Sequence, residues 1–410
     1  MITTINNEQK KLNFSSEREQ SQACLNTAEH EKNQGRKVLN VPNLRFKEFQ
    51  REWEKTKFGD IAIVVGGGTP DTNTSQYWNG KIQWFTPSEI GRNKYVYNSV
   101  RTISEEGLNK SSAKLLPIGT ILLSSRATVG ECSINKKECT TNQGFQSLIP
   151  KENISNEFVY YLIQTKRKDL IRKSCGSTFL EISANEIRKI VVSIPTIKEQ
   201  DKIAKLLSLL DERIATQNKI IEDLKKLKSA ISENLFKAVK GDVVILYEIC
   251  DIIKGKQING EFLSEKGKYY VMNGGTEPSG YYSDYNVEAN TISISEDGNS
   301  CGYVQFNSSP FWSGGHCYTI QKIADNVDNL YLYHYLKSHE DVIMKLRIGS
   351  GLPNIQKKDL AMFKIKLPTV EQQKSISTFL SSLERKAEIE EMLLNAMKKE
   401  KQYLLRQMFI

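Results

Sequence analysis

Basic and aromatic side chains alternate over the first large segment of the chain. Arg and Lys side chains can neutralise phosphate groups, and Arg or Asn can hydrogen-bond to the edges of bases. For any single member the alternative stays open that a tryptophan belongs to the core or a lysine to a solvated face. As a group the pattern predicts a nucleic-acid-binding surface that contains Thr69, Tyr77, Trp78, Arg92, Lys94, Tyr95, Arg126, Asn142, Lys166 and Arg167.

The charge of the chain is unevenly divided. Residues 41–195 hold 22 basic and 15 acidic side chains, whereas residues 241–368 hold 12 basic and 15 acidic side chains. A net negative segment is a poor footprint for non-specific phosphate binding. If the second segment reads DNA, either its contacts are localised basic and polar side chains or partner proteins must help. The candidate side chains, which lie in expected loops, are Lys254, Lys256, Asn273, Tyr281, Asn299 and Arg347.

The stretch Gly66 to Pro70 is rich in glycine but is not a phosphate-binding loop, because no GxxxxGK[ST] pattern follows it. We interpret it as a turn whose glycines let the backbone approach another group closely. The alternative is that it is a turn and nothing more.

No catalytic constellation stands out in the sequence. It lacks the [DNS]PP[YFW] tetrapeptide of amino-methyl transfer, a glycine fingerprint for dinucleotides and a Walker A motif. Its four histidines are not spaced as metal ligands, and His316, beside Cys317 in an expected strand, is assigned to packing. We expect no catalytic residue, no metal and no cofactor in this chain.

Cysteine usage and hydropathy bear on the compartment. The seven cysteines include no CxxC pair, which argues against a zinc ribbon and a disulfide framework. No apolar run approaches the ~18 residues of a membrane span, and the amino-terminal residues lack the apolar core of a signal peptide. We expect a soluble, cytoplasmic protein without a membrane partner.

Short β-branched runs separated by Gly and Pro, with a helical stretch near residues 157–173, predict a mixed α/β fold. Residues 1–40 are too polar to bury a core and are expected to form a disordered amino-terminal arm. The predicted order continues with an α/β domain at 41–195, a helix at 196–240, a second α/β domain at 241–368 and a second helix at 369–410.

The sequence is internally duplicated. Ile182 to Phe236 and Ile355 to Phe409 run in parallel without a gap, so that Pro195 corresponds to Pro368. Phe58 to Gly67 also resembles Leu246 to Gly255. The period is far too long for a solenoid, so the chain is expected to repeat one unit of domain plus helix.

Each predicted helix carries apolar residues at alternating spacings of three and four over five heptads, which is typical of a coiled coil. The first seam contains Ile203, Leu207, Leu210, Ile214, Gln217, Ile221 and Leu224. The second contains Ile376, Leu380, Leu383, Glu390 and Leu394. The natural partner of each seam is the other, although two helices packed separately on their own domains remain an alternative.

Connectivity predicts that the helices pair antiparallel, giving two domains held apart by a rod and related by a pseudo-two-fold axis. Gln217 and Glu390 are then expected near the middle of the rod, where polar groups can fix the register. About 36 residues at ~1.5 Å rise give roughly 54 Å. That length covers on the order of 15 base pairs of duplex.

Three features together resemble the specificity (S) subunit of type I restriction-modification systems. The first is the doubled Pro-x-x-x-Glu/Gln-Gln before a helix, and the second is the duplication itself. The third is a set of segments near the start, namely Val41-Pro42-Asn43-Leu44-Arg45-Phe46 with Phe49 and Trp53, Gly67-Gly68-Thr69-Pro70, Tyr77-Trp78-Asn79-Gly80 and Trp84-Phe85-Thr86-Pro87. The resemblance covers about residues 41–410.

The resemblance implies an adaptor and not an enzyme. Members of that family carry two target-recognition domains that each read one half of a bipartite sequence in double-stranded DNA, with paired helices as the spacer. The helices dock two modification (M) subunits, which bind S-adenosylmethionine and methylate adenine. Restriction (R) subunits join to cleave DNA with ATP and magnesium. All of these cofactors are expected on partner subunits.

Two other classes of function compete with this expectation. A self-contained DNA methyltransferase or nuclease would need a cofactor motif that the sequence lacks. A coiled-coil scaffold without nucleic-acid binding is opposed by the duplicated globular domains.

Overall fold

The computed structural model describes residues 39–176, 180–349, 351 and 353–410. Of the predicted arm at 1–40, only Leu39 and Asn40 therefore fall among the described residues. The chain divides into two compact units: the first runs to Leu210 and includes Glu400–Ile410, and the second comprises Asp211–Lys399. Each unit is a mixed α/β domain that includes parts of the two long helices, so the units divide the predicted helical segments.

The first unit contains two β-sheets and a separate strand pair. The larger sheet has the order β2-β9-β6-β7-β4, the smaller has the order β5-β3-β8, and β1 pairs antiparallel with β10. The strands are β1 (Glu54–Lys57), β2 (Ala62–Gly66), β3 (Trp78–Phe85), β4 (Tyr95–Val96), β5 (Arg101–Ile103), β6 (Ile121–Leu123), β7 (Cys132–Asn135), β8 (Cys139–Thr141), β9 (Gln146–Pro150) and β10 (Val191–Ile194). The helices are α2 (Phe58–Ile61), α3 (Glu105–Asn109), α4 (Asn156–Thr165), α5 (Arg167–Arg172), α6 (Ala184–Lys189) and the start of α7 (Ile197–Ala238), with short 3-10 turns at Ser75–Tyr77 and Pro87–Glu89.

Helix α4 lies in the core of the first unit. Its residues from Phe158 to Ile163 are all buried. A helix that is apolar on every side is stable only when other elements surround it. The carboxyl end of the chain supplies part of that surrounding, because Phe409 stacks on Phe158 at 5.2 Å between ring centroids.

The second unit repeats this plan. Its larger sheet has the order β12-β18-β15-β16, its smaller sheet the order β14-β13-β17, and β11 pairs antiparallel with β19. The strands are β11 (Asp242–Ile245), β12 (Asp251–Lys254), β13 (Tyr269–Met272), β14 (Gly280–Tyr282), β15 (Thr291–Ser295), β16 (Val304–Asn307), β17 (Trp312–Ser313), β18 (Cys317–Gln321) and β19 (Lys364–Leu367). The helices are α8 (Leu246–Ile249), α9 (Asn329–Ser338), α10 (Glu340–Met344), α11 (Lys357–Ala361) and α12 (Val370–Gln407), with a 3-10 turn at Gly260–Phe262.

The structure confirms that the duplication reaches upstream of Ile182 and Ile355. Helices α4 and α9 begin at Asn156 and Asn329, which have the same offset as Pro195 and Pro368. One glutamine in each unit makes the same two hydrogen bonds. The side-chain amide of Gln200 donates to the carbonyl of Pro195 and accepts from the amide of Ser155, both at 2.9 Å. Gln373 makes the equivalent bonds to Pro368 and Asp328, at 2.9 and 2.8 Å.

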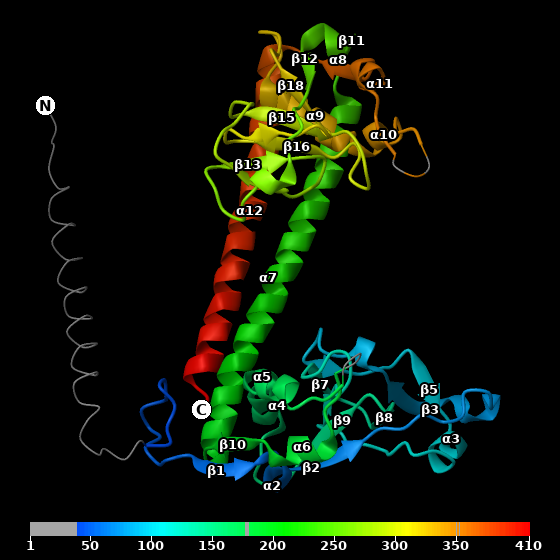
Figure 1. The fold of residues 1–410 in the computed structure, drawn as a ribbon, viewed down its shortest axis with the longest axis vertical. Helices are drawn as coiled ribbons and strands as arrows, with labels where there is room; N and C mark the ends of the chain where they lie inside the picture. The colour runs from blue at the N-terminus through cyan, green and yellow to red at the C-terminus, as the bar shows by residue number, and fades with distance from the viewer. Residues whose placement is uncertain (1–38, 177–179, 350, 352) are drawn as a thin grey trace, which may run out of the picture. The chain divides into compact units, whose positions relative to one another are not determined.

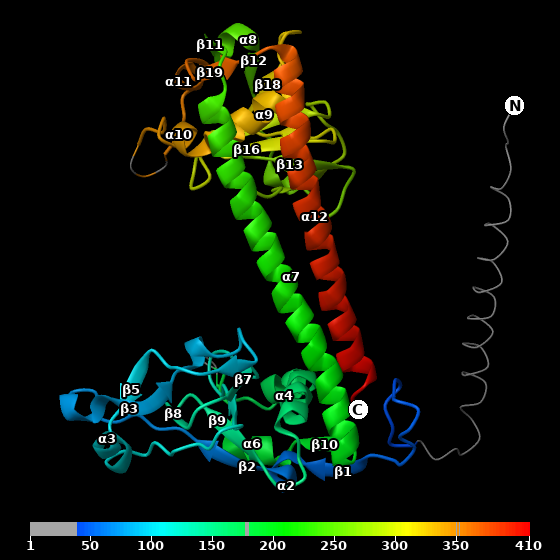
Figure 2. The same ribbon diagram turned by 180° about the vertical axis from the view of Figure 1, so that it is seen from behind.

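The two long helices pair antiparallel within the second unit (Figure 1). Gln217 on α7 donates to the carboxylate of Glu390 on α12 at 2.6 Å, and Lys228 pairs with Glu384 at 2.7 Å. Partner numbers that fall along α12 as they rise along α7 mark an antiparallel pair, which Figure 2 shows from behind. The predicted direction and the predicted polar pair are confirmed, and the alternative of separately packed helices is wrong.

Every predicted seam position is buried or half-buried. In the second unit this holds for Ile214, Gln217, Ile221 and Leu224 on α7, and for Ile376, Leu380, Leu383, Glu390 and Leu394 on α12. In the first unit Ile203 and Leu207 are buried in the domain core, where they join Met408 and Phe409, and Leu210 is also buried. The seam thus serves both as a helix contact and as part of a domain core.

A buried histidine makes the stability of the second unit depend on pH. His334 is 3% exposed on α9, bonded to the hydroxyl of Ser381 at 2.9 Å, and burial lowers its pKa to about 4. The unfolded chain, with a histidine pKa near ~6.5, binds a proton between about pH 6.5 and 4 that the folded unit does not. We expect the unit to lose about 2 kcal/mol as pH falls from 6.5 to 5, measured by urea unfolding.

The duplicated partner of His334 supplies the control for this prediction. Tyr161 stands at the equivalent place in the first unit and faces Ser208, which corresponds to Ser381. A His334→Tyr variant carries no group that titrates in this range, so its unfolding free energy should vary less with pH. An equal pH slope in both proteins would refute the assignment to His334.

Candidate nucleic-acid interface

Three loops of the first unit, which follow β2, β6 and β8, converge at one end of the strands. The loop after β2 bonds to the segment after β8, because the amide of Gly68 donates to the carbonyl of Thr141 at 2.8 Å. The loop after β6 joins them through the amide of Ser125, which donates to the carbonyl of Gly144 at 2.8 Å. We call residues 66–70, 124–128 and 141–144 the first loop cluster.

The first loop cluster brings together three of the predicted DNA-contact residues. The hydroxyl of Thr69 bonds to the side chain of Gln143, and Asn142 accepts from the amide of Gly144 at 2.9 Å. Arg126 is exposed and pairs with Glu181 at 2.9 Å. In an exposed pair the carboxylate holds the arginine loosely, so Arg126 remains accessible to a phosphate or a base.

Residues 67–70 follow β2 as an irregular segment and not as a turn, and their glycines allow a close backbone approach. A side chain on Gly67 would place its Cβ 2.0 Å from the carbonyl oxygen of Asn142, and one on Gly68 would lie 2.3 Å from the hydroxyl of Ser112. Close backbone approach is therefore confirmed, and the group approached is another loop of the same domain. The alternative that Gly66 to Pro70 is merely a turn is wrong.

The second unit contains an equivalent cluster of loops. The amide of Lys256, after β12, donates to the carbonyl of Ser313 at 2.8 Å, and the amide of Glu296, after β15, donates to the carbonyl of His316 at 2.9 Å. Asn273, after β13, accepts from the amide of His316 at 3.3 Å. We call residues 254–257, 273–275, 296–301 and 314–316 the second loop cluster.

The second loop cluster contains four of the six residues predicted for this domain. Lys254, Lys256 and Asn299 are exposed and Asn273 is half-buried. Lys254 pairs with Glu296 at 2.8 Å. Arg347 is exposed; burial raises the pKa of the Cys301 thiol in the cluster, and the charge of Arg347 opposes that rise. Tyr281 lies on β14, opposite Tyr270.

Other predicted residues have roles inside the first unit. The side chain of Lys94 is 9% exposed and pairs with Glu157 at 3.0 Å, and the hydroxyl of Tyr95 donates to the same carboxylate. These bonds hold the pKa of Glu157 below its usual range, although burial opposes them. Trp78 is buried, packs edge-on against Trp84 at 5.1 Å and donates to the carbonyl of Asp71 at 3.0 Å. For these three side chains the expectation of surface contact is corrected to a structural role.

The remaining members of the predicted set are not part of the first loop cluster. Arg92 is exposed and Tyr77 is half-buried in the turn before β3. Lys166 donates to the carbonyl of Ile410 at 2.8 Å, and the half-exposed Arg167 pairs with Glu131 at 2.7 Å. Arg167 and Arg92 remain accessible candidates for phosphate contact.

The expectation for His316 was wrong. It lies in the loop immediately before β18, with a side chain 47% exposed, and its Nδ1 is 2.5 Å from the carboxylate of Asp297. Sequence reasoning missed both residues, because the extended run around Cys317 reads as one continuous strand. The signal available was the Gly314-Gly315 pair before His316, which favours a loop.

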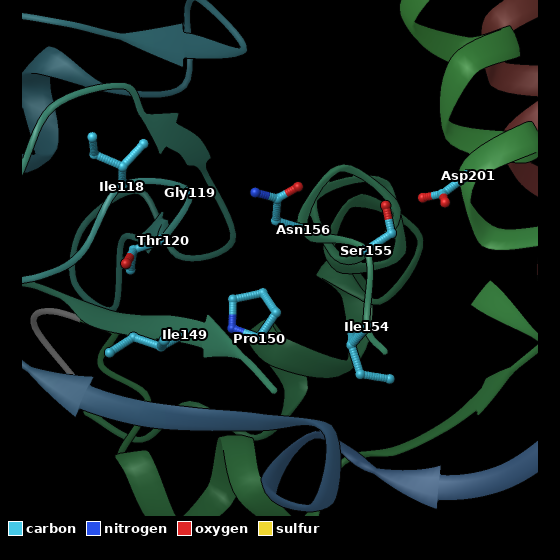
Figure 3. A pocket seen from close by; sticks show the side chains of 9 residues that line it. All are labelled: Ile118, Gly119, Thr120, Ile149, Pro150, Ile154, Ser155, Asn156 and Asp201. Carbon is cyan, nitrogen blue, oxygen red and sulfur yellow. The ribbon is translucent and has the colours of Figure 1, made fainter. Parts of the chain in front are cut away.

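A pocket of about 320 Å³ opens on the first unit, away from the loop cluster (Figure 3). It is lined by Ile118, Gly119, Thr120, Ile149, Pro150, Ile154, Ser155, Asn156 and Asp201. None of the predicted DNA-contact residues lines it.

Over the described part of the chain, no group of three or more His, Cys, Asp or Glu side chains is placed to hold a metal ion. In the same part, no helix combines the length and apolar character that a bilayer crossing requires.

The sequence matches the family model described as "Type I restriction modification DNA specificity domain" twice, over residues 50–226 and 239–399. The two matches together cover most of the chain, and each contains one α/β domain with adjoining helix.

Several similar proteins are named as specificity subunits of type I restriction enzymes. The MjaIX specificity subunit of Methanocaldococcus jannaschii is 39% identical over 190 residues, which are 45% of this chain and 44% of the relative. The EcoR124I/EcoR124II specificity subunit of Escherichia coli is 33% identical over 175 residues, 41% of this chain and 43% of the relative. The chain thus spans less than half the length of these two relatives. The putative MjaX specificity subunit of M. jannaschii is 26% identical and aligns over 86% of this chain and 92% of its own length.

Solved structures share the fold. The type I restriction-modification S subunit of M. genitalium superposes with a TM-score of 0.61 at 19% identity, covering 90% of this chain and 99% of that one. A chain from a structure that addresses complex assembly and conformational transition of the type I system gives 0.58 at 18% identity, covering 88% and 98%.

Proposed function

The chain belongs to the family of type I restriction-modification DNA specificity domains, and from this membership we propose that it is the DNA-recognition subunit of a type I restriction-modification complex. In this proposal each α/β domain reads one half of a bipartite site in double-stranded DNA. The observation that carries it is the loop cluster built twice at the same edge of the two domains, with equivalent backbone hydrogen bonds. Duplicated loops on a rigid scaffold suit the reading of two separate half-sites.

The exposed basic side chains support unequal roles for the two domains. Arg92, Arg126 and Arg167 are accessible in a domain with a net positive charge. The second loop cluster offers Lys254, Lys256 and Arg347 within a net negative segment, and Glu296 already pairs with Lys254. We therefore assign much of the phosphate contact at the second half-site to partner subunits.

The long helices support partner docking. Within the second unit, apolar side chains face solvent on both helices, namely Ile220 and Leu227 on α7 and Ile389, Met392 and Leu393 on α12, each 40–64% exposed. Exposed apolar groups at helical spacing are typical of a surface that another protein covers. We propose that two M subunits dock on the helix pair and that R subunits join them.

The chemistry in this proposal belongs to the partners. The M subunits bind S-adenosylmethionine and methylate adenine, and the R subunits use ATP and magnesium to cleave unmodified DNA. The chain itself is a non-catalytic subunit of that complex and acts in the cytoplasm.

The test is to purify the full chain with its M subunits and sequence the methylated bases of DNA treated with S-adenosylmethionine. We expect one motif of two short half-sites separated by a fixed gap, and no methyl transfer by the chain alone. Methylation without a bipartite motif, or by the isolated chain, would contradict the proposed function.

A further inference from the structure

His316 and Asp297 form a hydrogen-bonded side-chain pair in the second loop cluster. They come from different loops, and the imidazole Nδ1 lies 2.5 Å from the carboxylate of Asp297. A carboxylate can only accept a hydrogen bond, so Nδ1 carries the proton. In the neutral ring Nε2 is then an acceptor, and it has no hydrogen-bond partner among the residues that the structure describes.

The duplication shows that Asp297 occupies the place of Arg126 and that His316 occupies the place of Gly144. In the first unit the backbones of Arg126 and Glu181 form an isolated antiparallel β-bridge, and the amide of Ile182 donates to the carbonyl of Ser125. In the second unit the backbones of Asp297 and Asn354 form the same antiparallel β-bridge, and the amide of Ile355 donates to the carbonyl of Glu296. Where the first domain presents an exposed guanidinium, the second therefore presents an imidazole held by a carboxylate.

The surrounding loop holds the pair in position. Both Ser295 and Ser300 donate to the carbonyl of Gly274, and Ser300 does so at 2.7 Å. Gly274 has φ +84°, and a side chain there would meet the carbonyl oxygen of His316 at 2.9 Å. The imidazole is held by Asp297, and the backbone of His316 is bonded to Asn273 and Glu296. Its side chain stays 47% exposed, as a group that reads a ligand requires.

We propose that His316 reads a base in the second half-site and that Asp297 is its positioning residue. An acceptor at the floor of the major groove selects the exocyclic amino group of adenine or cytosine and rejects the carbonyl oxygens of guanine and thymine. This inference rests on the proposed function and names a residue that sets specificity in the second domain, where acidic side chains outnumber basic ones.

The experiment compares the methylated motif of the full complex for the native chain and for variants of this pair. His316→Ala should lower the preference for adenine or cytosine at one position of the second half-site about tenfold, with the first half-site unchanged. His316→Gln retains an acceptor and should restore part of the preference. Asp297→Asn should weaken it, because an amide can hold either tautomer of the ring.

The matched control is Asp251→Asn, which removes the same charge from the same domain in an exposed pair with Lys322. It should leave the motif unchanged. An unchanged motif in His316→Ala, or an equal loss at every position of both half-sites, would overturn the role of His316. Failure of the native complex to methylate any defined sequence would instead contradict the proposed function.

Discussion

Seven residues inserted into both α7 and α12, at Gln217 and at Glu390, should lengthen the gap between the methylated half-sites by about three base pairs. Two turns of helix add about 10 Å, and a base pair of duplex spans about 3.4 Å. A whole heptad in each helix preserves the seam that pairs them. Both half-site sequences should stay the same, because the loop clusters are untouched.

The control for this prediction is the same insertion in α7 alone. It shifts one seam against the other and separates Gln217 from Glu390, which are bonded at 2.6 Å in the native pair. We expect that variant to lose methylation at both the original and the lengthened site. A motif with an unchanged gap in the double insertion would exclude the helix pair as the element that sets spacing.

The second large effect should come from Glu199, a carboxylate that is 1% exposed at the start of α7. Arg45 donates to both of its oxygens, at 2.7 and 2.8 Å, and the indole of Trp53 donates at 3.2 Å. The carboxylate in turn raises the pKa of Arg45 above its ordinary value. Glu199→Ala leaves the guanidinium and the indole without their acceptor, and breaking a buried pair in this way costs about 3 kcal/mol or more.

Hydrogen exchange is the measurement for Glu199, because it reports the two units separately. The amides of residues 39–57 should exchange faster in Glu199→Ala, while those of the second unit should not change. Lys202→Ala is the control, since it removes a pair with Glu48 in which both side chains are about half exposed and should cost less than about 1 kcal/mol. Equal increases in the exchange rate of residues 39–57 from the two substitutions would show that the buried carboxylate of Glu199 stabilises this segment no more than an exposed ion pair does.

The equivalent place in the second unit shows how far the duplication goes. The residue that corresponds to Glu199 is Gln372, which is exposed. The adjacent glutamines, Gln200 and Gln373, keep the same bonds in both units. The repeat thus preserves the glutamine hydrogen bonds near the start of each long helix. The bonds of Glu199 to Arg45 and Trp53 are specific to the first unit, because Gln372 stands at the equivalent position.

Lys94 illustrates why single site residues were hard to predict. Its partners Glu157 and Ser208 lie 63 and 114 positions away in the sequence. No local pattern distinguishes a lysine whose side chain is largely buried against such partners from one that faces solvent. The same holds for Trp78, whose burial depends on contact with Trp84 across a bulge in β3.

His316 illustrates a different limit. Its role depends on where β18 begins, and a strand boundary that differs by one residue changes a side chain from core to surface. Asp297 lies 19 positions earlier, in the loop after β15. The glycines before His316 signalled a loop, but only the packing of two loops shows that the imidazole is held by a carboxylate.

The sequence by itself determined the duplication, the mixed α/β class and the seam of the two helices. These follow from self-similarity and from apolar spacing, which are properties of neighbouring residues along the chain. The tertiary structure alone decided which candidate residues share a loop cluster and which have structural roles inside the domain. It also decided that Asp297, bonded to His316, stands in the place of Arg126. Those outcomes depend on bonds between residues far apart in sequence, whose geometry exists only once the sheets and helices have packed.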